Sequence, residues 1–203
     1  MYQPQLLPFK KGLKGISDKT VSIHHDKLYI GYVNKRNEIH DKLSEIEHND
    51  PGKLDAANQT FSELRALKDG ETFAVNGVYL HEYYFNSLGG TGTPVGSLAT
   101  DLAKVYGSLD NFTRYFKACG MSARGWVVLG WDTHLGELRV YTGDAHNQGG
   151  VWGCIPIIVL DVYEHAYFID YGADRKAYVE DFMVNLNWDA VNEVYEKVKA
   201  FNR

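Results

Sequence analysis

Cysteine is scarce in this chain, which has only Cys119 and Cys154 among its 203 residues. The two do not form a Cys-x-x-Cys pair, and their spacing has no zinc-finger character. The simplest interpretation is a pair of buried, reduced thiols. A disulfide or a redox role is the alternative.

Long apolar runs and an excess of positive charge are also missing. No apolar segment approaches the roughly 18 residues that a membrane-spanning helix needs. The N-terminal residues 1–4 lack the basic and apolar regions of a signal peptide. A net charge of -5 argues against a general nucleic-acid or anionic-membrane surface. We therefore expect no nucleic-acid or membrane partner, a cytoplasmic location, and local positive charge wherever an anionic substrate binds.

What the chain has in the first half is helical periodicity. Residues 1–17, with Pro4 and Pro8, indicate an extended arm, and Ser17 or Asp18 is a candidate helix N-cap. The sequence Asn-Asp-Pro-Gly at 49–52 is a strong break, and Lys-Asp-Gly at 68–70 indicates a turn. The pattern predicts three helices, over residues 18–48, 53–68 and 72–88.

The second half mixes helices with a small sheet. The glycine-rich segment 89–94 is the clearest linker, so we place a domain boundary there, between residues 1–90 and 91–203. A hairpin-like loop at 132–136 indicates that the first two strands are antiparallel. The predicted elements are helices over 95–106 and 109–121, strands over 125–131, 137–142 and 155–160, and helices from about residue 174 to the end.

Titratable side chains follow the most apolar of these strands. Asp161 and His165 come directly after residues 155–160, which are wholly apolar apart from Pro156. An aspartate and a histidine are costly to bury unless something compensates them, and a metal ion would do so. His24 and His81 lie on predicted helices and are candidate partners, although each could equally be a hydrogen-bonded core histidine. Three imidazoles and one carboxylate form a ligand set that suits manganese, iron or zinc.

The segment Asp-Val-Tyr-Glu-His-Ala-Tyr at 161–167 resembles the signature of the iron/manganese superoxide dismutases, which usually reads Asp-Val-Trp-Glu-His-Ala-Tyr. Other segments resemble the family in the same order along essentially the whole chain. They are His24 to Asn34, Asn76 to His81, Gly125 to Leu129, and Arg175 with Asn187-Trp188.

The resemblance implies an α+β protein, with an N-terminal α-helical hairpin domain and a C-terminal α/β domain containing a small three-stranded antiparallel sheet. It implies one iron or manganese ion per chain, completed by a solvent ligand, that converts superoxide to dioxygen and hydrogen peroxide. The ligands it implies come from both domains and are His24, His81, Asp161 and His165.

The resemblance also assigns residues around the metal. In the family a glutamine or histidine hydrogen-bonds the solvent ligand, and one of its two possible positions here is Gly77, which cannot serve. His146 resembles the other, with Gln148 as the alternative and a surface-loop histidine as the plain interpretation. Tyr32 matches the gateway tyrosine of the family. Arg175, and less so the exposed Lys27, could supply positive charge for superoxide.

The chain departs from the family pattern at a few positions. Leu28 stands where the family usually has histidine, and Phe168 where it has tyrosine; in the family those two meet across the dimer interface at the substrate channel. Tyr163 and Phe85 replace tryptophans. Because both members of the polar pair are missing, we interpret the two replacements, Leu28 and Phe168, as one coupled change that makes the channel more apolar.

The resemblance further implies a homodimer, or a dimer of dimers, bridged by Glu164 and His165. A cytoplasmic, antioxidant superoxide dismutase is the leading hypothesis. The rival is a repurposed or low-activity relative that keeps the metal as a structural staple, which Leu28, Tyr163 and Phe168 motivate.

Overall fold

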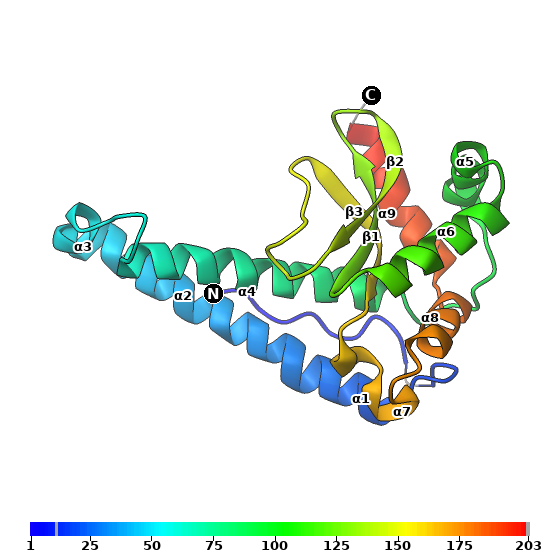
Figure 1. Ribbon diagram of the computed structural model, residues 1–203, viewed down its shortest axis with the longest axis horizontal. Coiled ribbons are helices and arrows are strands. Elements are labelled where there is room, and N and C mark those ends of the chain that lie inside the picture. The colour runs from blue at the N-terminus through cyan, green and yellow to red at the C-terminus, as the bar shows by residue number, and fades with distance from the viewer. Residues whose placement is uncertain (11, 202–203) are drawn as a thin grey trace.

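A computed structural model describes residues 1–10 and 12–201. A hairpin of long helices forms one side of the molecule, and a three-stranded sheet with its own helices forms the other (Figure 1). The predicted α+β class is confirmed. The helices are α1 (Asp18–Ile23), η1 (His24–Tyr29), α2 (Ile30–Asn49), α3 (Pro51–Asp55), α4 (Glu63–Asn86), α5 (Gly96–Tyr106), α6 (Leu109–Ser122), η2 (Glu164–Ala166), α7 (Phe168–Tyr171), α8 (Arg175–Val184) and α9 (Trp188–Phe201), and the strands are β1 (Trp126–Asp132), β2 (Glu137–Gly143) and β3 (Cys154–Asp161).

The first long helix begins where the sequence predicts. Ser17 is the N-cap of α1, and its hydroxyl accepts a hydrogen bond from the Thr20 N–H. The helical path then continues through η1 and α2 to Asn49. Within it, η1 is a π-helical turn in which the Ile30 N–H reaches back to the His25 carbonyl, five residues earlier. Such wide turns inside α-helices are frequent at functional sites.

The second and third predicted helices are wrong in their boundaries. Helix α3 ends at Asp55, and α4 runs without interruption from Glu63 to Asn86, through the predicted turn at 68–70. The real break has a local cause: the Asn58 side-chain oxygen accepts hydrogen bonds from the N–H groups of Thr60 and Phe61. Side chains of this type compete with the helix for backbone donors. Ser62 then caps α4 by accepting from the Arg65 N–H.

Gly70 lies inside α4, facing α2, and does not turn the chain. A Cβ atom at Gly70 would lie 3.2 Å from the Ile39 Cδ1 atom on α2. The glycine leaves room for Ile39 at this contact between the two long helices. The helices lie together near α3 and diverge toward α1 (Figure 1).

The sheet has the strand order β2-β1-β3, and both pairings are antiparallel. The β1–β2 hairpin is held by Asp132, whose carboxylate accepts the N–H groups of His134 and Leu135. On the other side of β1, Trp126 pairs with Asp161, which fixes the register of β3. This pairing sets the end of β3 beside the helical hairpin.

The core lies between the sheet and its helices. Residues Ile157 to Leu160 of β3 are completely buried, as a continuous apolar strand should be. Helices α4 and α9 pack against β3, and α6 packs against β1. Asp161, the last residue of β3, therefore lies at the contact between the sheet and α4.

The segment between α4 and α5 is tied to the rest of the chain. The N–H groups of Gly90 and Gly92 donate to the carbonyls of Asn185 and Leu186. A Cβ at Gly90 would lie 2.4 Å from the Asn187 Cα atom, so the backbone contact requires glycine here. The division of the chain at residue 90 stays a prediction.

Cys119 and Cys154 are both free and half-buried, so the disulfide alternative is wrong. No helix within residues 1–10 and 12–201 combines the length and apolar character needed to cross a membrane.

Candidate metal centre

His24 is the first residue of the π-helical turn η1. It is buried, and its ring packs against Tyr84 and Phe85 of α4, with ring centroids 5.0 and 5.2 Å away. The next residue, His25, is also buried but contacts the N-terminal arm, with its Nε2 atom 3.0 Å from the Gln5 carbonyl oxygen. The two successive imidazoles therefore contact different parts of the chain, His24 the helix α4 and His25 the N-terminal arm.

His81 comes from the middle of α4 and is fully buried. Its Nδ1 lies 2.5 Å from the carbonyl oxygen of Gly77, one helical turn earlier. A carbonyl can only accept, so Nδ1 carries the proton and Nε2 keeps a lone pair. Fixing the tautomer in this way is the usual means by which a protein orients a metal-binding imidazole.

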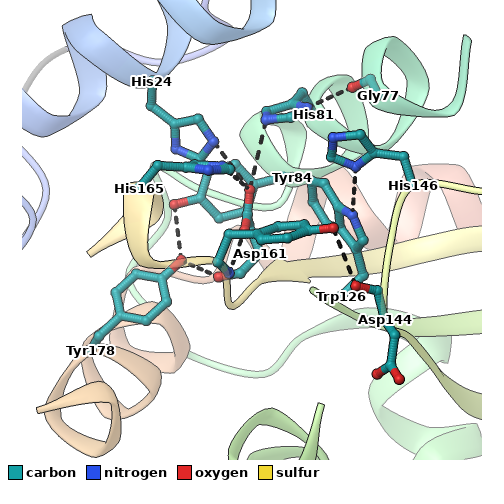
Figure 2. Close-up of polar contacts among 11 residues, drawn as sticks. His24, Gly77, His81, Tyr84, Trp126, Asp144, His146, Asp161, His165 and Tyr178 are labelled. Atoms are coloured by element: carbon teal, nitrogen blue, oxygen red, sulfur yellow. Dashed lines mark hydrogen bonds and ion pairs between the residues drawn. The ribbon is translucent and has the colours of Figure 1, made fainter. Parts of the chain in front are cut away.

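Asp161 ends β3 and is also fully buried. Its Oδ1 accepts the Tyr163 N–H at 2.9 Å, and its backbone carbonyl accepts the Tyr178 hydroxyl at 2.7 Å. These bonds leave Oδ2 directed toward the histidines (Figure 2). The carboxylate is therefore oriented by groups that follow it in the chain.

His165 lies in the short helix η2, which the chain enters directly after Asp161 and Val162. Its ring stacks on Tyr163, with centroids 5.3 Å apart and planes 14° apart. Its side chain is 27% exposed, in contrast to the other three residues. The centre is therefore closest to solvent on the His165 side.

The four side chains converge on one point (Figure 2). The Nε2 atoms of His24, His81 and His165 lie 3.2, 3.7 and 3.0 Å from the Asp161 Oδ2 atom. The four candidate ligand atoms all lie within 4.8 Å of one another. One cation could contact all four.

The donor atoms themselves indicate that a cation belongs here. The Nε2 atoms of His24 and His81 are buried and have no hydrogen-bond partner among the described residues. A buried polar atom left without a partner costs about 1–3 kcal/mol. A metal ion would satisfy both nitrogens at once, so the residues present fit an ion.

Electrostatics also favour the ligand forms of these groups. Burial lowers the pKa of His24, and burial together with His24 lowers that of His81 well below its ordinary value. Burial raises the pKa of Asp161, but His165 and His24 beside it outweigh that effect and hold the pKa far below its usual range. His24, His81 and Asp161 are therefore held in the forms that bind metals, two neutral imidazoles and an ionised carboxylate. For His165, burial lowers the pKa, but the charge of Asp161 and its hydrogen bond outweigh burial and raise it.

His146 lies beside the four candidate ligands. It is buried, and its ring meets Tyr32 edge-on, 4.7 Å away, and His81 5.8 Å away. The Trp126 indole N–H donates to the His146 Nδ1 atom at 2.9 Å. Burial lowers the pKa of His146 to about 4, so the ring is neutral. Because Nδ1 accepts, the single ring proton lies on Nε2, and His146 presents a hydrogen-bond donor.

Tyr32 is a residue of α2, and its ring lies 5.3 Å from the His81 ring of α4. Burial, followed by the charge of Asp161, raises its pKa to about 12, so the hydroxyl remains protonated at neutral pH. A Cβ atom at Gly77 would lie 2.8 Å from the Tyr32 ring. The position that could have carried a glutamine is therefore filled by the tyrosine ring.

Gly77→Ala is expected to destabilise the protein by about 1–3 kcal/mol, because the added methyl group must displace the Tyr32 ring from a packed site. Gly70→Ala is the matched control in the same helix. There the new Cβ meets only the flexible end of Ile39, and alanine gains about 1 kcal/mol of helix propensity over glycine. Urea unfolding of both variants measures the difference. Equal stabilities would contradict the role of Gly77.

Other predicted residues lie farther from the convergence point. Gln148 is exposed, and its backbone closes a turn with Asp144 and Ala145. Arg175 is half-buried, and its guanidinium donates to the Ala123 carbonyl at 2.8 Å and the Tyr167 hydroxyl at 3.3 Å. The side chain of Arg175 therefore makes structural hydrogen bonds, in addition to any positive charge that it adds to the site.

Sequence analysis missed the residues that hold the site in place. The Trp126 indole orients His146, and the Tyr178 hydroxyl bonds both the Asp161 carbonyl and, at 3.1 Å, the Tyr84 hydroxyl. Tyr84 follows His81 by three residues and so shares its helix face. That spacing was the one available signal for Tyr84; Tyr178 is 17 residues from Asp161.

Fold and site together define a class: a helical hairpin and an α/β unit with three imidazoles and one carboxylate arranged for a single metal ion. Comparison with known families agrees. Residues 6–89 match the alpha-hairpin domain of the iron/manganese superoxide dismutases, and residues 94–194 match the C-terminal domain of the same family. The chain belongs to the iron/manganese superoxide dismutase family.

Individual relatives support this assignment. The chain is 45% identical over 194 residues to an iron superoxide dismutase of Aquifex pyrophilus, covering 94% of this chain and 90% of that protein. It is 36% identical to a manganese enzyme of Halobacterium salinarum over 184 residues, covering 90% and 88%. An iron enzyme of Cupriavidus metallidurans is also 36% identical, covering 87% and 86%.

Proposed function

We propose that His24, His81, Asp161 and His165 hold the one iron or manganese ion of this superoxide dismutase. The observation that carries the proposal is the convergence of three imidazole Nε2 atoms on the Asp161 Oδ2 atom, two of them buried without another partner. The ligand set contains nitrogen and oxygen and no thiolate, which suits iron and manganese.

The chain is an oxidoreductase that acts on superoxide. When bound, the ion supplies one-electron redox chemistry, by which one superoxide becomes dioxygen and the next, with two protons, becomes hydrogen peroxide. The protein's own residues bind the ion, exclude water from three of its four ligands, and hold protons nearby. Of the four ligands, His165 is the one that borders solvent in the single chain.

His146 and Tyr32 are the proposed proton-bearing groups at the centre. His146 presents its Nε2–H because Nδ1 is occupied by the Trp126 indole. Tyr32 keeps its phenolic proton because its pKa is raised to about 12. Arg175 would add positive charge for an anionic substrate while anchoring Ala123, and Lys27, which is exposed, would add a weaker long-range attraction.

Replacing His146 with leucine is expected to lower dismutation by about 10–100-fold while the protein keeps its metal, because the lost donor orients groups around the ion rather than binding it. Gln148→Leu is the matched control in the same loop and should retain full activity. Rate and metal content are measured on the same samples. A larger loss in the Gln148 variant would assign the role to Gln148 instead.

The proposed domains are residues 1–90 and 91–203. His24 and His81 then belong to the helical domain, and Asp161 and His165 to the α/β domain. One ion held by all four would link the two domains, so binding energy would contribute to the stability of the whole chain.

We also propose a cytoplasmic, antioxidant role and a homodimer formed through Glu164 and His165, with a dimer of dimers as the larger form. Glu164 is exposed beside a ligand histidine, so its carboxylate is free to meet a second copy. Phe168, four residues later, is 55% exposed, and Leu28 is half-buried. An apolar, exposed aromatic side chain next to the solvent side of the centre is consistent with burial in that contact.

The double variant Leu28→His, Phe168→Tyr is expected to raise turnover. Two polar side chains would replace the apolar pair and could relay protons toward the centre, whereas either single variant would leave one polar group without its partner. Stopped-flow dismutation rates of the double and both single variants give the comparison. No gain in the double variant would mean that the apolar pair does not limit proton supply.

The test of the proposed function is elemental analysis of natively purified protein, with dismutation assayed on the same sample. Iron or manganese near one per chain with robust activity is the expected result. A filled site with negligible activity after reconstitution with each redox metal would refute it.

A further inference from the structure

A row of tyrosines leads away from the metal centre, in a chain that contains 14 of them. Tyr84 begins the row, with its ring 5.0 Å from the His24 ring. Its hydroxyl lies 3.1 Å from that of Tyr178, and both residues are buried (Figure 2). Tyr84 and Tyr178 are neither metal ligands nor proton-bearing groups in the proposed function.

Beyond Tyr178 the row divides. The Tyr167 ring stacks on Tyr178 with centroids 5.2 Å apart, and the Tyr171 ring meets it edge-on at 5.8 Å. The step from Tyr84 to Tyr178 is a hydrogen bond between hydroxyls, and the other steps are contacts between aromatic rings, within the range in which such rings interact directly. The row therefore connects His24 to two possible end points.

The charges at those two ends differ in sign. The Tyr171 hydroxyl donates to the Asp181 carboxylate at 2.9 Å, whereas Tyr167 has the Arg175 guanidinium 5.8 Å from its ring and bonded to its hydroxyl. A nearby cation opposes the removal of an electron from a ring, and a nearby carboxylate favours it and can accept the released proton. Tyr171, which is half-buried, is thus the favoured end.

We infer that Tyr84, Tyr178 and Tyr171 form an electron-transfer path that carries oxidising equivalents away from the metal ligands to Tyr171. The oxidant is of the hydroxyl-radical class. It would arise when one electron from superoxide, supplied through the bound ion, splits hydrogen peroxide, the product of the enzyme, into hydroxide and this oxidant. The path would protect the buried His24 and His81 from oxidation.

Electrons and protons balance over the proposed path. The oxidant takes one electron through Tyr84 and Tyr178 and becomes hydroxide. Tyr171 supplies that electron, its phenolic proton passes to the Asp181 Oδ2 atom, and a neutral tyrosyl radical remains. Superoxide, the substrate, then returns one electron to Tyr171 and leaves as dioxygen, while Asp181 returns the proton.

The test uses iron-loaded protein treated with hydrogen peroxide. Freeze-quenched electron paramagnetic resonance, with ring-deuterated tyrosine to identify the signal, detects the radical, and peptide mass spectrometry maps oxidised histidines. Wild-type protein should show a tyrosyl radical. Tyr171→Phe and Tyr178→Phe should each lose it and accumulate more oxidised His24 and His165.

Two controls make the result specific. Tyr195→Phe removes an equally buried tyrosine whose hydroxyl bonds Asp101, and Tyr167→Phe removes the branch beside Arg175; both should keep the radical. If Tyr178→Phe folds poorly, because its hydroxyl holds the Asp161 carbonyl, Tyr171→Phe decides, since it leaves that bond intact. An undiminished radical in Tyr171→Phe, or an equal loss in Tyr195→Phe, would overturn the inference.

Discussion

Removal of the metal is expected to lower the melting temperature of this protein by roughly 8–16 °C. An ion bound at 1,000 times its dissociation constant stabilises the folded state by about 4 kcal/mol. Each kcal/mol corresponds to about 2–4 °C in a chain of this size. The physical origin lies in the site: without the ion, the Nε2 atoms of His24 and His81 are buried with no hydrogen-bond partner in the described chain.

Calorimetry on the chelator-treated and reloaded protein measures this effect. Zinc provides the matched control, because it accepts nitrogen and oxygen ligands but has no redox chemistry. Zinc should therefore restore the melting temperature without restoring dismutation, whereas iron or manganese should restore stability, and the active one of the two should restore both. A metal-free protein that melts at the same temperature as the loaded one would contradict the proposed ligand set.

The sequence predicted the fold class and most element boundaries because those features are local. Ser17 before an apolar periodicity, and two strands separated by a turn at 132–136, are recognised from neighbouring residues. The helix near Gly70 was mispredicted because glycine has two uses. It can turn a chain, but here it lets α4 approach Ile39 on α2, a contact set by tertiary packing.

The candidate site also has residues that the sequence predicts and residues that it does not. The four ligand candidates followed from a motif and from the cost of burying charge, and the structure brings them within 4.8 Å. The groups that orient them could not be predicted, since the partners are distant in sequence: Trp126 lies 20 residues from His146, and Tyr178 lies 94 residues from Tyr84. The first contact forms when β1 pairs with β2, and the second when α8 packs near α4.

Asp161→Asn is expected to abolish metal retention and, with it, dismutation. Asparagine keeps the shape of the side chain and can still accept the Tyr163 N–H, so the turn after β3 should survive. The negative charge is lost, however. The amide would stand beside the three imidazole nitrogens in place of the carboxylate, and an amide binds iron or manganese poorly. The loss in metal affinity should exceed the roughly 10–100-fold typical of residues that only orient the ligands.

Asp132→Asn is the matched control for this prediction. Asp132 is also a buried carboxylate, but it lies at the opposite end of β1 from Trp126, the residue that pairs with Asp161. It accepts backbone N–H groups and the Tyr141 hydroxyl rather than facing the histidines. Its replacement should lower stability modestly and leave metal content near one per chain. Because both variants remove one buried charge, a loss of metal confined to Asp161→Asn would trace the effect to ligation, and equal metal content in the two would exclude Asp161 as a ligand.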